Sequence, residues 1–286
     1  MSIVHLLQIL VLALIQGAAE MLPISSTAHV TVAARLMNFD HGTDSQWAFL
    51  LIMLHTGTML AVLVYFRARW KLLWKQVPAL AVATLATLAV GYVLKELIKH
   101  FFLRGAAGKQ PQEIEHLFLQ LPLIAAALAA AGIVILVAGL KDRKSPGRRS
   151  DIGLWPATVV GIVQGLALPF RGFSRSGSTI STGMFFGIDR IRAEEFSFAL
   201  AVLLTPVVIV YEARQIVGHA AAVSDPQHGL VPLVLASLAG MVFSFLAGLL
   251  ALRWLSRWLE RGRWQWFGGY CLVAAVAVLA IHFAMP

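Results

Sequence analysis

A polar cluster near the start of the chain has the residue types and spacing for acid–base or metal chemistry. Gln16 and Glu20 are four residues apart, so on a helix they share one face, where they could hold a divalent cation or orient a water. Ser26 and His29 follow just beyond Pro23, close enough for a hydroxyl and a general base to converge at the start of a second helix. Because ionisable groups are costly in an apolar setting and are functional there by default, we interpret this cluster as part of a site.

Helix capping is the alternative interpretation of the hydroxyl residues in this first cluster. Ser25, Ser26 and Thr27 form a Ser-Ser-Thr run, and such residues are preferred at the N-terminus of a helix. The carboxylate of Glu20 and the imidazole of His29 beside this run favour the functional interpretation.

A second polar cluster, at residues 171–179, has the composition of an anion-binding site. It contains two arginines and four hydroxyl residues within nine positions. Glycine and hydroxyl residues at a helix start let backbone N–H groups point at one anion, and the guanidinium of Arg175 could clamp that anion through two hydrogen bonds. We therefore expect a phosphate here. The alternative is a polar turn between helices whose arginines reach toward lipid headgroups.

The segments that must position these clusters are those of an integral membrane protein. The chain has 286 residues, is 59% hydrophobic and 13% charged, and has a mean hydropathy of +0.78, which makes a soluble fold the poorer interpretation. Its apolar residues form blocks long enough to cross a bilayer as a helix, which takes about 20 residues. The six blocks span residues 47–66, 78–98, 118–140, 195–213, 230–252 and 266–284. The net charge of +9 does not indicate nucleic acid binding, because the basic residues lie between the blocks rather than on one face.

Two further apolar regions, 3–37 and 153–188, are interrupted by polar turns. Each is predicted to be a re-entrant helix-loop-helix, because irregular backbone at membrane depth is tolerated where protein or a water-filled cavity satisfies its polar groups. Each region precedes three of the six full spans, so we predict an all-α polytopic membrane protein built as an inverted repeat. The predicted parts are a first repeat, 1–140, a cytoplasmic linker, 141–152, and a second, inverted repeat, 153–286.

The basic residues of the loops predict the orientation in the membrane. Most of them lie around residues 67–75, 141–149, 190–192 and 253–263. The positive-inside rule makes these loops cytoplasmic and puts both termini on the other side.

Two polar features outside the clusters receive structural interpretations. His55 lies within a predicted span and is interpreted as a polar contact packed between helices. Glu194 and Glu195, beside Arg190 and Arg192, are interpreted as a solvated cytoplasmic charge cluster.

The motifs, taken in their order along the chain, resemble the undecaprenyl pyrophosphate phosphatase family of bacterial cell-wall lipid recycling. Four stretches carry the resemblance and together cover most of the chain. They are Gln16, Glu20, Leu22-Pro23, Ser25-Ser26-Thr27 and His29; His55, Gly57 and Thr58; Gly172, Ser174-Arg175-Ser176-Gly177 and Thr179; and Glu195-Phe196-Ser197-Phe198. The chain departs from the family pattern at Ala28, where glycine is usual, at Arg171, where proline is usual, and at Gln16, where many members have glutamate. These departures bear on loop geometry, substrate preference and metal affinity.

The resemblance implies a multi-pass enzyme of the bacterial inner (plasma) membrane that removes the terminal phosphate from undecaprenyl diphosphate, usually with Mg²⁺ or Ca²⁺. Catalysis is assigned to Glu20, Ser26, His29 and Arg175, and Ser26 is favoured over His29 as the nucleophile. Gln16 and Glu20 are assigned to the cation. The residues assigned to substrate binding are Ser25, Thr27, Ser174, Ser176, Gly177 and Thr179. The expected partner is a polyprenyl diphosphate lipid, and the sequence leaves both a monomer and a homodimer open.

A transporter or flippase of a polyprenyl phosphate lipid is the main alternative function, because inverted repeats with broken helices are a transporter architecture. The set of Glu20, Ser26 and His29 favours an enzyme, since transport alone does not require it. The type-2 phosphatidic acid phosphatases are excluded, because that class needs a histidine six residues after the arginine of its Ser-Arg motif, where this chain has Ser181.

Overall fold

The computed structural model describes residues 2–40, 42–69, 74–105, 120–144, 149–218 and 230–284. Within these residues it contains ten α-helices, one short 3-10 helix and no β-strand, which confirms the all-α prediction. The elements are α1 (Ile3–Met21), α2 (Ser26–Leu36), α3 (Asp44–Tyr65), η1 (Trp74–Gln76), α5 (Val77–Gly105), α7 (Leu121–Lys144), α8 (Leu154–Ala167), α9 (Arg175–Phe185), α10 (Arg190–Gly218), α12 (Leu230–Glu260) and α13 (Trp264–Ala284). Part of the predicted linker, residues 145–148, lies outside the described residues.

Each of the six apolar blocks predicted as a span is a helix, namely α3, α5, α7, α10, α12 and α13. Among the described residues, however, seven helices are long and apolar enough to cross a membrane, one more than we predicted. The additional helix is α1, whose single Asp, Glu, Lys or Arg residue is Glu20 in its last turn. The apolar helix α8 has 14 residues, too few for a span, and α2 and α9 have 11 residues each.

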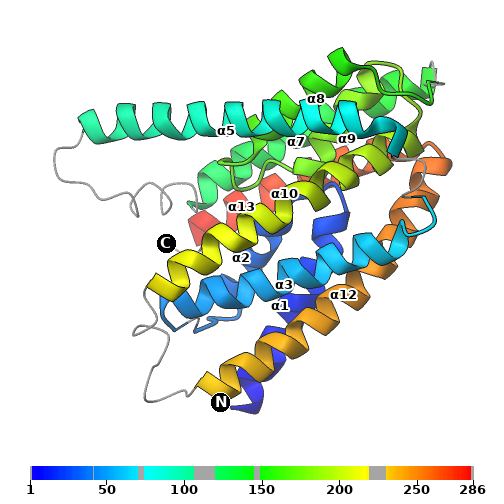
Figure 1. The fold of residues 1–286 in the computed structure, drawn as a ribbon. Coiled ribbons are helices and arrows are strands. Elements are labelled where there is room, and N and C mark those ends of the chain that lie inside the picture. Colours follow the sequence, from blue (N-terminus) through cyan, green and yellow to red (C-terminus); the bar gives the residue numbers. More distant parts are fainter. Residues whose placement is uncertain are drawn as a thin grey trace. The chain divides into compact units, whose positions relative to one another are not determined.

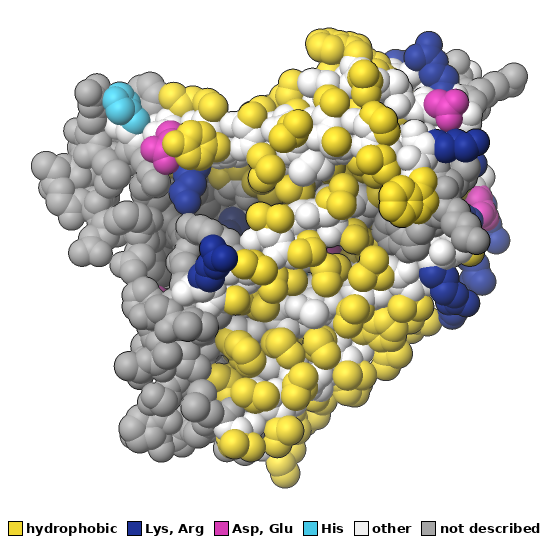
Figure 2. Space-filling model, in the orientation of Figure 1, with side chains coloured by type: hydrophobic (Ala, Val, Ile, Leu, Met, Phe, Trp, Pro, Cys, Tyr) yellow, Lys and Arg dark blue, Asp and Glu magenta, His cyan; other side chains and the backbone are white. Residues whose placement is uncertain are grey.

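Apolar side chains cover the outward faces of the long helices, as expected for a protein surrounded by lipid. On α12 the exposed apolar residues recur every three or four positions and form one stripe. This stripe contains Val231, Leu235, Leu238, Val242, Leu246 and Leu250. On the face shown in Figure 2, apolar side chains dominate the described surface, and charged ones lie toward its edges.

The chain forms two packing units, and each unit draws on both halves of the sequence. Unit 1 comprises Met1–Leu22, His29–Trp70 and Ala201–Leu255, whereas unit 2 comprises Pro23–Ala28, Lys71–Leu200 and Ser256–Pro286.

In unit 1, glycines let α1, α3 and α12 approach each other closely (Figure 1). A Cβ added to Gly17 of α1 would collide with the carbonyl oxygen of Ser244 on α12, and one added to Gly57 of α3 would collide with that of Met241. The Ser244 hydroxyl donates to the carbonyl oxygen of Leu54 on α3 over 3.0 Å. This packing fixes the segment of α1 that carries Gln16 and Glu20 of the first polar cluster.

In unit 2, two helix pairs are packed through small residues in the same way. Helix α8 lies against α5 at Gly161 and Gly165, where the Thr87 hydroxyl donates to the Gly161 carbonyl oxygen over 2.9 Å. Helix α7 lies against α13 where Gly132 meets Gly268. Small residues at such contacts are typical of membrane helices, whose association depends on close packing and hydrogen bonds rather than on the hydrophobic effect.

Candidate active site

The last turns of α1 bring Gln16 and Glu20 together in unit 1, as the spacing predicts. The Gln16 amide nitrogen donates to Oε2 of Glu20 over 3.2 Å. Gln16 is 1% exposed, so this hydrogen bond satisfies a polar group that burial would otherwise penalise. The carboxylate of Glu20 is thus held by a rigid neighbour on its own helix.

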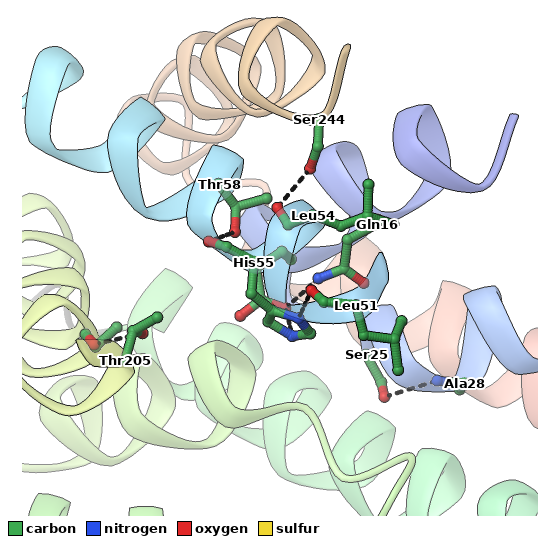
Figure 3. A network of polar contacts seen from close by, with 11 residues as sticks. Gln16, Ser25, Ala28, Leu51, Leu54, His55, Thr58, Thr205 and Ser244 are labelled. Atoms are coloured by element: carbon green, nitrogen blue, oxygen red, sulfur yellow. Dashed lines mark hydrogen bonds and ion pairs between the residues drawn. The ribbon is translucent and has the colours of Figure 1, made fainter. Parts of the chain in front are cut away.

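His55 on α3 faces the same carboxylate, an approach that the spacing of residues did not reveal. Its Nε2 lies 3.8 Å from Oε2 of Glu20, while its Nδ1 lies 2.8 Å from the carbonyl oxygen of Leu51. Figure 3 shows the imidazole beside Gln16, and the Thr58 hydroxyl bonded to the His55 carbonyl oxygen. The prediction of a polar contact between helices is confirmed, and the group contacted is the candidate catalytic carboxylate. The signal in the sequence was a histidine inside an apolar span, in a His-x-Gly-Thr motif.

The turn after α1 places Ser25 at the N-terminus of α2. Ser25 has a φ of 67°, a left-handed conformation that is strained for a residue with a side chain and is often found at functional sites. Its hydroxyl accepts from the Ala28 N–H over 3.5 Å (Figure 3), so the capping interpretation holds for Ser25. Ser26 begins α2 and is buried, and His29 follows three residues later on the same helix.

The second cluster, in unit 2, forms the turn before α9 and its first turn. Gly172 has a φ of 122°, and a Cβ at this position would lie 2.6 Å from the Ile124 carbonyl oxygen, so glycine is needed both for conformation and for space. The Ser174 hydroxyl accepts from the Gly177 N–H over 3.1 Å and caps α9. Arg175 is the first residue of the helix, where the positive end of the helix dipole attracts an anion.

Hydroxyl residues within α9 connect Arg175 to the neighbouring helix. Thr179 is 1% exposed, and its hydroxyl lies 2.9 Å from the Arg175 carbonyl oxygen and 2.6 Å from the Ser197 hydroxyl on α10. Ser178 also donates to the Arg175 carbonyl oxygen, over 2.9 Å. In this structure the Thr179 side chain, which we assigned to substrate binding, is bonded within the protein. Ser197 belongs to the Glu-Phe-Ser-Phe motif, to which the sequence alone gave no role.

The two glutamates near the start of α10 are buried, so the prediction of a solvated cluster is wrong. Glu194 is 0% exposed and accepts from the Ser256 hydroxyl, and Glu195 is 4% exposed and accepts from Arg192 over 2.7 Å. Arg190 is bonded to Asp142 of α7. The pairing of opposite charges is present between Arg192 and Glu195. Glu194 and Arg190 are bonded instead to Ser256 and Asp142, which are distant in the sequence.

The two clusters resemble each other in local structure. In each, a helix containing a buried glutamine followed by glycine, Gln16-Gly17 or Gln164-Gly165, leads to a turn with a residue at positive φ. A serine, Ser25 or Ser174, then caps an 11-residue helix. The assignment of both Glu20 and Arg175 to catalysis implies that they lie close together, and this stays a prediction.

The first cluster offers oxygen donors suited to a divalent cation. No group of three or more His, Cys, Asp or Glu side chains suited to a metal ion occurs among the described residues. Mg²⁺ is commonly held by one or two carboxylates with water and substrate phosphate oxygens completing its coordination, and the partly buried carboxylate of Glu20 beside Gln16 fits that pattern.

Comparison with known proteins agrees with the motifs over nearly the whole chain. The family described as bacitracin resistance protein BacA matches residues 9–277. The chain is 52% identical over 285 residues to undecaprenyl-diphosphatase 2 of Acinetobacter baylyi, covering 96% of this chain and 98% of that protein. It is 34% identical to the undecaprenyl-diphosphatase of Idiomarina loihiensis, covering 97% and 99% of the two chains. Its identity to the undecaprenyl-diphosphatase of Rhodopirellula baltica is 32%, covering 97% and 98%.

Proposed function

We propose that the chain hydrolyses undecaprenyl diphosphate to undecaprenyl phosphate and inorganic phosphate, because it belongs to the bacitracin resistance protein BacA family. The observation that carries this proposal is the near full-length similarity to proteins named undecaprenyl-diphosphatase, over a range that includes both polar clusters. The activity recycles the lipid carrier of cell-wall synthesis. The enzyme is a multi-pass protein of the bacterial inner membrane, and its substrate's prenyl chain stays in the bilayer.

The second cluster binds the diphosphate. The Arg175 guanidinium contacts two phosphate oxygens in one plane, and the N-terminus of α9 directs backbone N–H groups at the same anion. Ser174, Ser176 and Gly177 form the wall of this subsite. Because the negative charge of a transferring phosphoryl group is spread over its oxygens, donors fixed in this way lower the barrier as well as binding the substrate.

The first cluster supplies the nucleophile. The Ser26 oxygen attacks the terminal phosphorus, the bond from that phosphorus to the bridging oxygen breaks, and its electron pair leaves with undecaprenyl phosphate. The serine proton passes to His29, and water then hydrolyses the phosphoserine to release inorganic phosphate. His29 as the direct nucleophile is the alternative. Ser25 and Thr27, on either side of Ser26, complete the substrate contacts.

Glu20 is the residue that holds the divalent cation, Mg²⁺ or Ca²⁺, with Gln16 beside it. A bound cation neutralises the charge of the diphosphate oxygens. Gln16 fixes the carboxylate of Glu20 by the hydrogen bond within α1.

We further propose that the two halves, 1–140 and 153–286, joined by the linker 141–152, form an inverted repeat of six spans and two re-entrant helix pairs. The helix contacts support it. In unit 1 the first helix of the first repeat, α1, lies against the fourth helix of the second, α12; in unit 2, α8 and α5 make the reciprocal contact. In both contacts a glycine packs against the carbonyl oxygen of a hydroxyl residue, Gly17 against Ser244 and Gly165 against Thr87. A homodimer leaves the assignment unchanged, because each chain carries both clusters.

Purified protein in detergent tests the proposal directly. Incubation with undecaprenyl diphosphate, and separately with shorter prenyl diphosphates, is expected to release phosphate, and a chelator is expected to stop the release. Substrate binding without any phosphate release, for every lipid tried and with Mg²⁺ or Ca²⁺ present, would favour a transporter or flippase instead.

A further inference from the structure

His55 faces the Glu20 carboxylate within unit 1 and has no role in the reaction proposed above. The two side chains are 37% and 13% exposed, respectively, so neither is surrounded by bulk water. Their separation of 3.8 Å from Nε2 to Oε2 is too long for a hydrogen bond. At this distance a protonated imidazole would form an ion pair with the carboxylate, whereas a neutral imidazole leaves two acceptor atoms facing each other.

The ring of His55 is held in one tautomer by its own helix. A carbonyl oxygen only accepts hydrogen bonds, so the 2.8 Å contact with Leu51 requires the hydrogen to be on Nδ1. Nε2 of the neutral ring then presents a lone pair toward Glu20. Histidines that bind metals almost always donate their other ring N–H in this way, often to a backbone carbonyl, and the bond fixes both tautomer and orientation.

The distance between the two acceptors suits one shared cation. Metal–nitrogen and metal–carboxylate bonds are about 2.0–2.2 Å long, so two ligands of one ion lie about 3–4 Å apart. Oε2 of Glu20 also accepts from Gln16, which orients the carboxylate from within α1. On the α3 side, hydrogen bonds from Thr58 and Ser244 hold the backbone next to His55. Both ligands are thus preorganised.

We propose that His55 and Glu20 together ligate the divalent cation, and that the site consequently prefers Mn²⁺ to Ca²⁺. Mg²⁺ and Ca²⁺ take oxygen ligands, whereas an imidazole nitrogen favours transition-metal ions. Two protein ligands leave coordination positions open, as catalytic metal sites do. The inference deepens the proposed function and rests on it for the remaining ligands, which are water and the diphosphate oxygens of the substrate.

Electron paramagnetic resonance of bound Mn²⁺ tests this inference without measuring activity. The full-length protein, purified with a tag that contains no histidine, is titrated with MnCl₂, and spin-echo modulation detects nitrogen bound directly to the metal. The expected result is nitrogen modulation in the wild type and its loss in His55→Asn. The asparagine amide keeps the donor to the Leu51 carbonyl but removes the ligand atom, so the Mn²⁺ affinity is expected to fall by about tenfold or more.

Two further variants separate ligation from packing. His55→Gln places an amide oxygen near the position of Nε2, so it is expected to shift the preference from Mn²⁺ toward Ca²⁺. Thr56→Val is the matched control on α3, because the Thr56 hydroxyl donates to the Ile52 carbonyl of its own helix, and it is expected to leave Mn²⁺ affinity unchanged.

The outcomes distinguish this inference from the proposed function. Wild-type protein that releases phosphate but shows no nitrogen modulation, or His55→Asn protein that binds Mn²⁺ as tightly as the wild type, would overturn the metal-ligand role alone. Nitrogen modulation that depends on His55, in a protein that releases no phosphate from any prenyl diphosphate, would support the metal site and overturn the phosphatase proposal.

Discussion

Individual side chains in the two clusters are held mainly by backbone groups of their own helices. Ser25 and Ser174 accept from helix N–H groups, and Thr179 donates to the Arg175 carbonyl oxygen. Hydrogen bonds of this kind show what fixes a side chain, but they do not show whether that side chain takes part in the reaction. Adjacent hydroxyl residues with similar burial can therefore have different roles, and single substitutions separate them.

Ser25 and Ser26 form such a pair. Ser26→Ala is expected to retain lipid binding but to lower kcat by about 10³-fold or more, because it removes an interaction needed only on the path to the transition state. Ser25→Ala is expected to lower the free energy of unfolding by about 1 kcal/mol through loss of the cap. Phosphate-release kinetics and thermal unfolding in detergent measure the two effects. Near-normal turnover by Ser26→Ala would exclude Ser26 as the nucleophile. Trapping of an acid-labile phosphoenzyme would then test His29 as the nucleophile.

Arg175 is expected to need its planar guanidinium rather than only its charge. Arg175→Lys should lower kcat/KM by about 10²-fold, because an ammonium group cannot make the paired hydrogen bonds that fix a phosphate. Arg261→Lys, at an exposed position after α12, is the control and should be neutral. Wild-type kinetics for Arg175→Lys would show that the second cluster provides only a general positive field.

The sequence predicted local features of the site better than contacts between helices. The spacing of Gln16 and Glu20 placed them on one face correctly, because that relation depends only on the helical repeat. The approach of His55 to Glu20 depends on how α1 packs against α3, which no spacing reveals. The burial of Glu194 was mispredicted for the same reason, since its partner Ser256 lies on α12.

Whole helices are positioned by small residues at their contacts. The apolar blocks predicted six of the long helices, since block length and hydropathy are properties of continuous sequence. The pairing of α8 with α5 could not be predicted from block length and hydropathy. A glycine inside an apolar helix is equally compatible with a helix contact and with an exposed position. The structure distinguishes the two cases.

Gly161 and Gly269 provide a matched test of these contacts. A Cβ at Gly161 of α8 would collide with the backbone of Ala83 on α5, whereas at Gly269 of α13 it meets nothing within 4 Å. Gly161→Ala is therefore expected to lower stability by about 1–3 kcal/mol, through overpacking. Gly269→Ala is expected to be neutral or stabilising by up to about 1 kcal/mol, because alanine favours the helix. Equal unfolding temperatures for the two variants would contradict the packing of α8 on α5.

At the scale of the whole molecule, the proposed topology puts the basic loops in the cytoplasm and both termini outside. Single cysteines introduced at Arg69 and Asp151 are expected to resist an impermeant thiol reagent in intact cells, and one at Ser2 is expected to react. The native Cys271 is buried and gives a low background. Labelling of both loop positions in intact cells would reverse the orientation, and labelling of only one would exclude a common side for the two loops.

The most direct test of the proposed hydrolysis is the fate of the terminal phosphate of undecaprenyl diphosphate in vesicles containing the purified protein. With the substrate labelled in that phosphate, we predict free labelled phosphate and undecaprenyl phosphate in equal amounts over many turnovers, and release of both that is slower by about 10²-fold with Arg175→Lys. Transfer of intact undecaprenyl diphosphate to the opposite leaflet, with the label still on the lipid, would contradict the proposed hydrolysis.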